Sequence, residues 1–371
     1  MKNNFSPLNF LASLGAGGIS VIPFAFFQYT HHKSKGLITF SQIDHFNLGG
    51  FKQGLFHSLE AVMIVFTLIH IYLTIVNLFG LSKWVKSEEY EGFKNDPLRN
   101  AALMTPFLSL AMSMNVVIGP IRFFIPNLAS NLQAMMLPAL IGITLLALYA
   151  MYWEIKLLKI SFSNSFDVAK INFGWLLHPF ALGMITVTAT GIAAMSKNHT
   201  YASIAAFLAL TIGSMATFLL VVKVVSIFQS HFNADGLPAK QFMPSFLIVV
   251  PIITILAISG FRLSHYFEHN FGFHMDAVGV LIVVIAFAFE TWYLLFGIAL
   301  LKTYLKTDFR EKEYYVSQWG LICPFVAYSV LGSFVWKLFV PNPVIYTVVL
   351  ISAVTSIIFF FIMLKKQFKY S

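Results

Sequence analysis

Apolar runs of about 20 residues recur along nearly the whole chain, and they restrict its fold more than any other feature. The first run, residues 8–29, contains no charged side chain. The hydrocarbon core of a bilayer is about 30 Å thick, which about 20 residues of α-helix can cross. Charged residues make up 11% of the 371 positions, whereas a soluble domain carries about 25%. The sequence therefore predicts an all-α polytopic membrane protein.

Ten spans are predicted, and they pair into five helical hairpins within a single membrane domain, residues 1–371. The spans cover residues 8–29, 55–79, 101–121, 132–158, 175–195, 200–229, 243–263, 275–304, 318–339 and 343–364. The hairpins are residues 8–79, 101–158, 175–229, 243–304 and 318–364. The mildly apolar patch at residues 36–40 in the first loop is too short to cross a bilayer.

Basic residues are distributed unevenly between the two sides of this arrangement. Seventeen Lys and Arg residues, from Lys2 to Lys369, fall on the side of the N-terminus, and seven, including Lys35, fall on the other side. Cytoplasmic segments of membrane proteins are enriched in Lys and Arg. We therefore expect a multi-pass protein of the plasma (inner) membrane with both termini in the cytoplasm. Most of the net charge of +9 is then a topology signal, and no nucleic-acid partner is predicted.

Each odd-numbered span contains a proline, and these prolines recur at a nearly constant interval. They are Pro23, Pro106, Pro179, Pro251 and Pro324, separated by 83, 73, 72 and 73 residues. A phenylalanine follows the proline at four of these places and at no other of the 14 prolines: Phe24, Phe107, Phe180 and Phe325. Regular internal similarity indicates a repeated structural unit. We interpret the pattern as one hairpin used five times in the same direction.

The prolines also indicate which spans lie inside. A proline interrupts the backbone hydrogen bonds of a helix and kinks it. At membrane depth such a break is tolerated where the backbone is buried in protein or lines a water-filled cavity. The odd spans are also rich in small and hydroxylated residues, as in "SLGAGGIS" and "MITVTATGIAAM". We therefore expect proline-kinked odd helices around a central pore, with the even helices facing lipid.

This pattern of ten helices in five hairpins, with a proline in every odd helix, resembles the tellurite-resistance/dicarboxylate transporter family. That family includes the TehA-like proteins and is related to the plant slow-type anion channels. The resemblance covers nearly the whole chain as architecture. It implies a homotrimer in which each subunit has its own anion pore, closed by a phenylalanine beside the proline of the ninth helix.

Residue by residue, the family's ninth-helix proline matches Pro324. Its gating phenylalanine, directly before that proline, falls on Cys323, the single cysteine of the chain. Phenylalanine instead occupies the next position, Phe325. Either Phe325 closes the pore from there, or the phenylalanines after the other prolines close it together, namely Phe24, Phe107 and Phe180. Cys323 is either a small packing residue or a thiol-sensitive part of the gate.

Other polar residues near the membrane have two interpretations each. His178, directly before Pro179, is a candidate for pH sensing or a packing residue. Arg122 is either an interfacial anchor or a charge that attracts anions to the outer mouth. Glu60 and Glu290 lie on even helices, where a buried partner between hairpins or subunits is favoured over a role in the pore. The histidines of the outer loops have no distinctive spacing, so no metal site is predicted.

The function predicted from these features is an anion channel or transporter for small inorganic or carboxylate anions, gated by phenylalanine. Aromatic rings can close a pore by sterics and dewetting, and amide and hydroxyl donors can contact an anion weakly. Proton-coupled export of tellurite, sulfite or dicarboxylate-type anions is the nearest alternative. A haem-bearing electron-transfer subunit is a remote one, based on His57, His70 and His178. No cofactor is predicted, and without a nucleophile–base constellation or phosphate loop neither is an enzyme activity.

Overall fold

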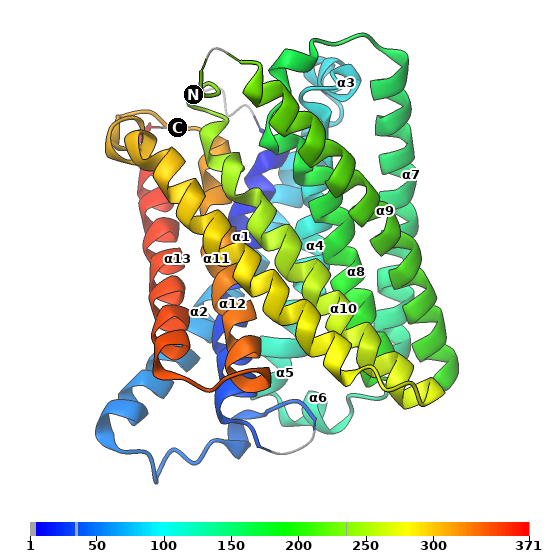
Figure 1. Ribbon diagram of the computed structural model, residues 1–371, viewed down its shortest axis with the longest axis vertical. Helices are drawn as coiled ribbons and strands as arrows, with labels where there is room; N and C mark the ends of the chain where they lie inside the picture. Colours follow the sequence, from blue (N-terminus) through cyan, green and yellow to red (C-terminus); the bar gives the residue numbers. More distant parts are fainter. Residues whose placement is uncertain (1–4, 34–35, 235, 371) are drawn as a thin grey trace.

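A computed structural model describes residues 5–33, 36–234 and 236–370, so Lys2 and Lys35 lie outside the described residues. The described part of the chain is built from helices and loops and contains no strand. Ten helical segments in it are long and apolar enough to cross a membrane, which confirms the predicted polytopic all-α fold. Both ends of the chain lie at the same end of the molecule, the termini face (Figure 1). The other end is called the opposite face below.

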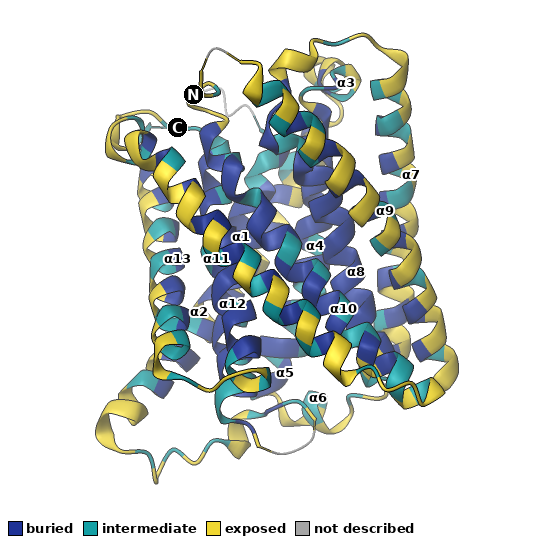
Figure 2. Ribbon diagram, in the orientation of Figure 1, coloured by how far each residue is buried: buried dark blue, intermediate teal, exposed yellow. Residues whose placement is uncertain are grey.

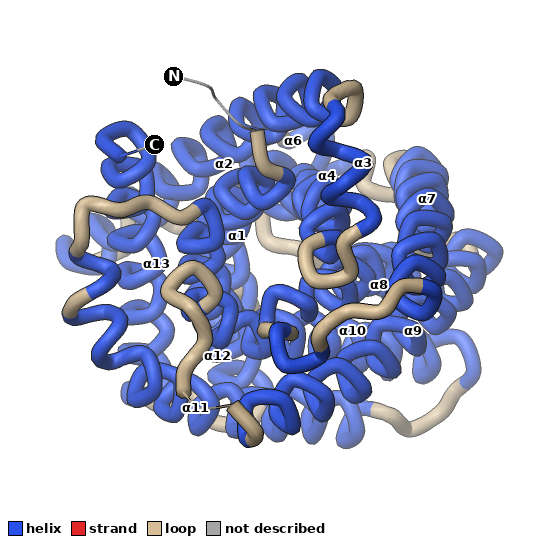
Figure 3. Tube along the Cα trace, turned by 90° about the horizontal axis from the view of Figure 1, so that it is seen from above, coloured by secondary structure: helices blue, strands red, loops and turns tan. Residues whose placement is uncertain are grey.

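Five helices form an inner ring. They are α1 (Phe10–Phe26), α4 (Thr105–Val116), α8 (Leu177–Met195), α10 (Val249–Phe271) and α12 (Ile322–Leu338). Each packs against the next in this order, and α12 packs against α1, so the ring is closed (Figure 3). In the most apolar stretch of each inner segment, 67 to 100% of the residues are buried. The inner ring therefore consists of the odd-numbered spans.

Five longer helices surround this ring. They are α2 (Gly50–Trp84), α7 (Met136–Ser163), α9 (His199–Phe232), α11 (Asp276–Lys306) and α13 (Pro343–Tyr370). Each packs between the inner helix of its own hairpin and the inner helix of the next one. Only 28 to 39% of their most apolar stretches are buried, and their outer sides are exposed (Figure 2). Apolar side chains cover these exposed sides. This exposed apolar surface suits contact with lipid.

Shorter helices lie at the two faces. On the termini face, α3 (Glu88–Asn95) follows α2, and single 3₁₀ turns occur at Val168–Lys170 and Asp308–Arg310. On the opposite face, α5 (Arg122–Phe124) and α6 (Pro126–Ser130) follow α4, and a 3₁₀ turn at Phe40–Gln42 interrupts the loop before α2.

Four of the five recurring prolines lie in the first turn of their α-helix. Pro106 is the second residue of α4, and Pro179, Pro251 and Pro324 are the third residues of α8, α10 and α12. Each of these helices directly follows a 3₁₀ segment: Asn100–Met104, Phe173–Leu176, Met243–Ile248 and Val316–Leu321. A proline loses little in a first turn, where the backbone N–H has no partner within the α-helix. These prolines thus mark a change from 3₁₀ to α geometry instead of the expected kink inside an α-helix.

Pro23 has a different place from the other four. It is the fourteenth of the 17 residues of α1, close to a π-helical turn at Phe27–His31. The third residue of α1, which corresponds in position to Pro179 of α8, is Ala12. A π-helical turn also ends α4, at Val117–Ile121, and contains Pro120. The first interval of 83 residues therefore joins two prolines at different depths of their helices.

Polar side chains connect the outer helices to the inner ring. His70 of α2 donates from Nδ1 to the carbonyl oxygen of Ser13 on α1 at 2.7 Å, and its Nε2 lies 2.8 Å from Ser113 Oγ on α4. Glu290 of α11 accepts a hydrogen bond from Thr254 of α10. These bonds span helices within the membrane, where an unpaired polar group is costly. The buried partner of Glu290 thus lies within its own hairpin, not in a neighbouring hairpin or subunit as expected.

A buried cluster of ionisable side chains joins the second and third hairpins. The Glu154 Oε2 atom of α7 lies 2.6 Å from His178 Nδ1 on α8, and the two side chains are 0% and 1% exposed. Lys223 of α9 donates to the carbonyl oxygen of Trp175 at 3.4 Å and lies 4.6 Å from the centre of its ring. Trp175 belongs to the 3₁₀ segment Phe173–Leu176, which directly precedes α8. Lys223 therefore supplies a donor to a backbone carbonyl of the 3₁₀ segment that precedes α8.

Replacing His178 by leucine should destabilise the fold, because the carboxylate of Glu154 would stay buried without its closest partner. The expected loss is about 3 kcal/mol, measured as a lower unfolding temperature in detergent. His178→Gln keeps an N–H donor and should lose less. The exposed histidine at the start of α9, His199, provides the control, since His199→Leu should unfold like the parent. A His178→Leu variant as stable as the parent would contradict this role.

Candidate functional site: two cavities that meet within the helix ring

A central cavity of about 160 Å³ lies inside the inner ring. All five inner helices contribute to its wall, through residues such as Gly18, Asn115, Thr188, Thr254 and Ala327. A single buried water needs about 10–15 Å³ of this kind of space. The cavity therefore has room for several waters or for a small anion with part of its water shell.

A second cavity of about 350 Å³, the vestibule, lies at the termini face. Its wall includes residues from the 3₁₀ segments that precede α4, α8, α10 and α12, for example Ala102, Gly174, Pro244 and Gly320. The 3₁₀ segments thus lie on the termini side of the ring and surround the vestibule.

Two residues belong to the described walls of both cavities: Phe180 of α8 and Cys323 of α12. The two helices are separated in the ring by α10, so they approach the cavities from different sides. Phe180 is 3% exposed and Cys323 is 7% exposed. Phe180 directly follows the first-turn proline Pro179, and Cys323 directly precedes the first-turn proline Pro324. These two side chains therefore mark the place where the vestibule and the central cavity are separated.

The other three candidate phenylalanines occupy different environments. Phe325 stacks on Phe359 of the outer helix α13, with ring centres 5.4 Å apart. Phe107 packs against Tyr149 of the outer helix α7 at 5.5 Å. Phe24 lines the central cavity near the opposite face and lies against Gly119. Of the four, Phe180 is thus the one placed between the cavities, whereas Phe325 and Phe107 face outer helices.

The charged side chains among the described residues of the two walls are both arginines. Arg99 lines the vestibule and Arg262 of α10 lines the central cavity, and no carboxylate is found among these wall residues. Arg262 donates from its guanidinium to the carbonyl oxygen of Val187 at 2.7 Å. The described ion pairs, which join atoms within 4.0 Å, do not include Arg262. A guanidinium has five N–H donors, so donors remain for a negatively charged ligand.

Arg122 does not present its charge to solvent. Its side chain is buried, and it donates to the carbonyl oxygens of Ile118 at 2.9 Å and Ile38 at 2.6 Å. Gln28 holds the same loop by accepting from the backbone N–H of Ile38 at 2.7 Å. The neighbouring residue Leu37 lines the central cavity. Arg122 therefore fixes the loop that covers the cavity on the opposite face, which differs from both roles considered from the sequence.

His178 and Glu290 lie behind the cavity walls. The ring of His178 is hydrogen-bonded to Glu154 on the outer helix α7, and His178 is absent from the described walls of both cavities. Glu290 is 0% exposed and reaches the central cavity only through Thr254, whose hydroxyl lies 2.5 Å from Glu290 Oε1. The second oxygen of Glu290 has no hydrogen-bond partner among the described residues.

The histidines considered for haem ligation differ in their partners, and the Nε2 atom of His178 has no hydrogen-bond partner among the described residues. Both ring nitrogens of His70 have partners, Ser13 and Ser113, within 2.8 Å. His57 Nδ1 lies 3.3 Å from a carboxylate oxygen of Glu60, and His178 pairs with Glu154. An axial haem ligand needs a free imidazole nitrogen directed at the iron. The geometry around His70 therefore argues against the electron-transfer alternative.

In the described part of the chain, ten helices long and apolar enough to cross a membrane surround internal cavities, as in a polytopic α-helical membrane protein with space for a small solute. Residues 4–366 match the family described as voltage-dependent anion channel, SLAC1. Because the match covers nearly the whole chain, the protein belongs to this family, which includes the TehA-like proteins and the plant slow-type anion channels. A comparison with curated proteins finds no match. Membership supports anion channel or transporter function in general.

Sequence reasoning did not identify Arg262 and Arg99 as wall residues. In the sequence, Arg262 counts only as a basic residue of the outer side, although its neighbours in "AISGFRLS" are apolar or small. A charge within an apolar span is a functional signal in membrane proteins. Arg99 carries no such signal, because it lies in a polar loop between two helices.

The single cysteine allows the separation between the cavities to be tested by chemical labelling. In Phe180→Ala the barrier beside Cys323 is removed, so a small water-soluble thiol reagent should modify Cys323 on the order of tenfold faster. Phe325→Ala is the matched control and should react like the parent, because that ring packs on α13. Labelling is followed by intact-mass spectrometry, with Cys323→Ser as the blank. Faster labelling in Phe325→Ala than in Phe180→Ala would contradict the placement.

Proposed function

We propose that the protein conducts small inorganic or carboxylate anions through the vestibule and the central cavity. The observation that carries this proposal is the charge of the two walls: their described charged side chains are Arg99 and Arg262. A positive group in a narrow, low-dielectric passage raises the local concentration of anions and repels cations. Family membership supports the same class of solute.

Weak contacts along the wall suit passage better than tight binding. Asn115 donates to the hydroxyl of Thr188 at 2.7 Å, and both residues line the central cavity together with Thr254. Conduction requires sites that are favourable enough to enter and weak enough to leave. Neutral hydroxyl and amide groups, with one guanidinium near the opposite face, meet that requirement.

Phe180 and Cys323 form the proposed gate. In the described conformation their side chains separate the two cavities, and an aromatic ring excludes a hydrated ion by size and by dewetting. Cys323 lies where the family resemblance implies a gating phenylalanine, and it leaves more space there than a phenyl ring would. We infer that the ring of Phe180, from α8, takes over the closing role.

The proposed setting is the plasma (inner) membrane, with the termini face in the cytoplasm. The uneven distribution of Lys and Arg supports this orientation. The vestibule would then open to the cytoplasm. The homotrimer implied by the family resemblance stays a prediction, testable by the mass of the purified protein.

The proposal is tested by ion-substitution flux in liposomes containing the purified protein. Chloride, nitrate, sulfite, tellurite and dicarboxylates are compared for the parent, Arg262→Gln and Arg262→Lys. Loss of the charge in Arg262→Gln should lower anion flux roughly tenfold, whereas Arg262→Lys keeps a cation and should retain most of it. Phe180→Ala should raise flux, and Phe325→Ala should not. Absence of anion flux in both the parent and Phe180→Ala would reject the proposal.

Proton-coupled export is a second candidate function, because of the environment of Glu290. Its carboxyl group is completely buried, is joined to the cavity wall through Thr254, and has one oxygen without a described partner. A buried carboxyl group next to a transport pathway is a common proton carrier in membrane transporters. Glu290 is therefore the residue on which coupling would depend.

Glu290→Gln separates the two functions. In a channel, current reverses at the Nernst potential of the anion whatever the pH gradient, and Glu290→Gln should leave this reversal unchanged. In a coupled exporter, the reversal potential of the parent shifts with the pH gradient and Glu290→Gln abolishes the shift. We expect the channel result, measured as reversal potential in planar bilayers. Ala286→Ser, one turn away on α11, serves as the control for packing effects.

A further inference from the structure

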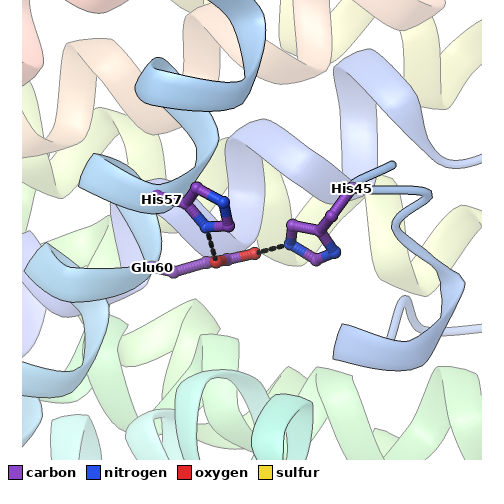
Figure 4. Close-up of side chains that lie close together, drawn as sticks. All are labelled: His45, His57 and Glu60. Atoms are coloured by element: carbon purple, nitrogen blue, oxygen red, sulfur yellow. Dashed lines mark hydrogen bonds and ion pairs between the residues drawn. The ribbon is translucent and has the colours of Figure 1, made fainter. Parts of the chain in front are cut away.

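Three side chains that commonly bind metal ions, His45, His57 and Glu60, lie close together (Figure 4). They lie at the start of α2 and in the loop before it, on the opposite face (Figure 1), and are absent from the described walls of both cavities. His57 and Glu60 are three residues apart on α2, so they project from the same side of that helix. His45 reaches them from the loop before α2. The His45 Nε2 atom lies 2.6 Å from Glu60 Oε1, and His57 Nδ1 lies 3.3 Å from Glu60 Oε2.

We propose that His45, His57 and Glu60 bind a divalent transition-metal ion of the Zn²⁺ class. Two imidazole nitrogens and one carboxylate oxygen, with a water in the fourth position, are a ligand set that Zn²⁺ uses. Mg²⁺ and Ca²⁺ prefer sites built from oxygen ligands alone. This site is separate from the anion pathway, and the proposal does not rest on the proposed function.

The geometry is close to what such an ion needs. Zn–N and Zn–O bonds of about 2.0–2.1 Å place the ligand atoms of a tetrahedral site about 3.3 Å apart. His57 and Glu60 already have a separation of 3.3 Å, and the three ligand atoms all lie within 4.8 Å of one another. The two imidazole rings are stacked with an interplanar angle of 10°, and each directs a nitrogen at one oxygen of the Glu60 carboxylate. Withdrawal of His45 from Glu60 by less than about 1 Å would admit the ion.

Burial favours a cation at this place and also leaves a route to it. The side chain of Glu60 is 8% exposed, and a buried carboxylate is stable only with positive or hydrogen-bonding partners. His45 is 16% exposed and His57 is 54% exposed, so an ion can enter from the side of His57. No sequence pattern indicates this site, because His45 lies 15 residues before Glu60 in a loop.

A second cluster on the same face fits a metal less well. His265, Glu268 and Asp276 contribute one imidazole and two carboxylates. The side chains of His265 and Asp276 are 47% and 67% exposed and lie 3.6 Å apart. Exposed carboxylates remain solvated without an ion, and one nitrogen ligand gives little preference for Zn²⁺. His265 is therefore a suitable residue for a control variant.

Metal binding would tie the covering loop to α2. The ring of Phe40 packs against His45 with centres 4.9 Å apart. Two residues earlier, Ile38 is hydrogen-bonded to Gln28 and Arg122, and Leu37 lines the central cavity. An ion shared by His45 and α2 would thus restrain the whole segment from 37 to 45.

The site is tested by titrating the purified full-length protein with Zn²⁺ in a calorimeter. One Zn²⁺ per chain is expected. His57→Ala, at a half-exposed position, should weaken binding by roughly 100-fold or more, and Glu60→Gln should do the same. His265→Ala should bind like the parent, and Mg²⁺ should not compete. In hydrogen exchange, Zn²⁺ should slow the amides of residues 36–47 in the parent but not in His57→Ala.

Three results would overturn the proposal. They are the absence of Zn²⁺ binding in the parent, an unchanged affinity in His57→Ala, and a loss of binding in His265→Ala. Neither calorimetry nor hydrogen exchange measures transport, so both test the metal site separately from the proposed anion pathway. A protein that binds Zn²⁺ but transports no anion would support the metal site and reject the proposed function. A protein that transports anions but binds no Zn²⁺ would do the opposite.

Discussion

Hydrocarbon offers no hydrogen-bond partner to a backbone amide, and both rings of helices follow from this constraint. The inner segments contain 3₁₀ turns, π-helical turns and prolines, which leave backbone groups without regular partners. The outer helices α2, α7, α9, α11 and α13 are α-helical from end to end and can face lipid with an apolar surface. Irregular backbone is thus kept inside, where side chains such as Lys223 or water in a cavity can satisfy it.

The same constraint divides the buried polar residues into two groups with different roles. Glu154, His178 and His70 are bound to partners on neighbouring helices and stabilise the packing of the two rings. Arg262 and Arg99 line cavities without a carboxylate among the described wall residues. A buried charge with a close partner is structural, whereas a charge that faces a cavity large enough for a small anion can act on a solute. The family membership of the chain agrees with an anionic solute.

Much of the fold could be predicted from the sequence, because hydrophobic length is a local property. Apolar runs and the positions of Lys and Arg indicated ten spans, and the prolines indicated which spans lie inside. The first repeat was less accurate: Pro23 lies near the end of α1, whereas Pro179 lies in the first turn of α8. Regular spacing in the sequence does not report the depth of a residue in its helix, since the lengths of loops and of preceding 3₁₀ segments vary.

The sequence by itself determined the all-α polytopic membrane fold and its apolar spans. Only the tertiary structure decided which side chains face the cavities. Phe180 and Phe325 both follow a first-turn proline, yet one lies between the two cavities and the other stacks on α13. Likewise His45 meets Glu60 only because the loop folds back onto α2. The rotation of each helix and the path of each loop depend on packing against distant residues, and no local pattern encodes them.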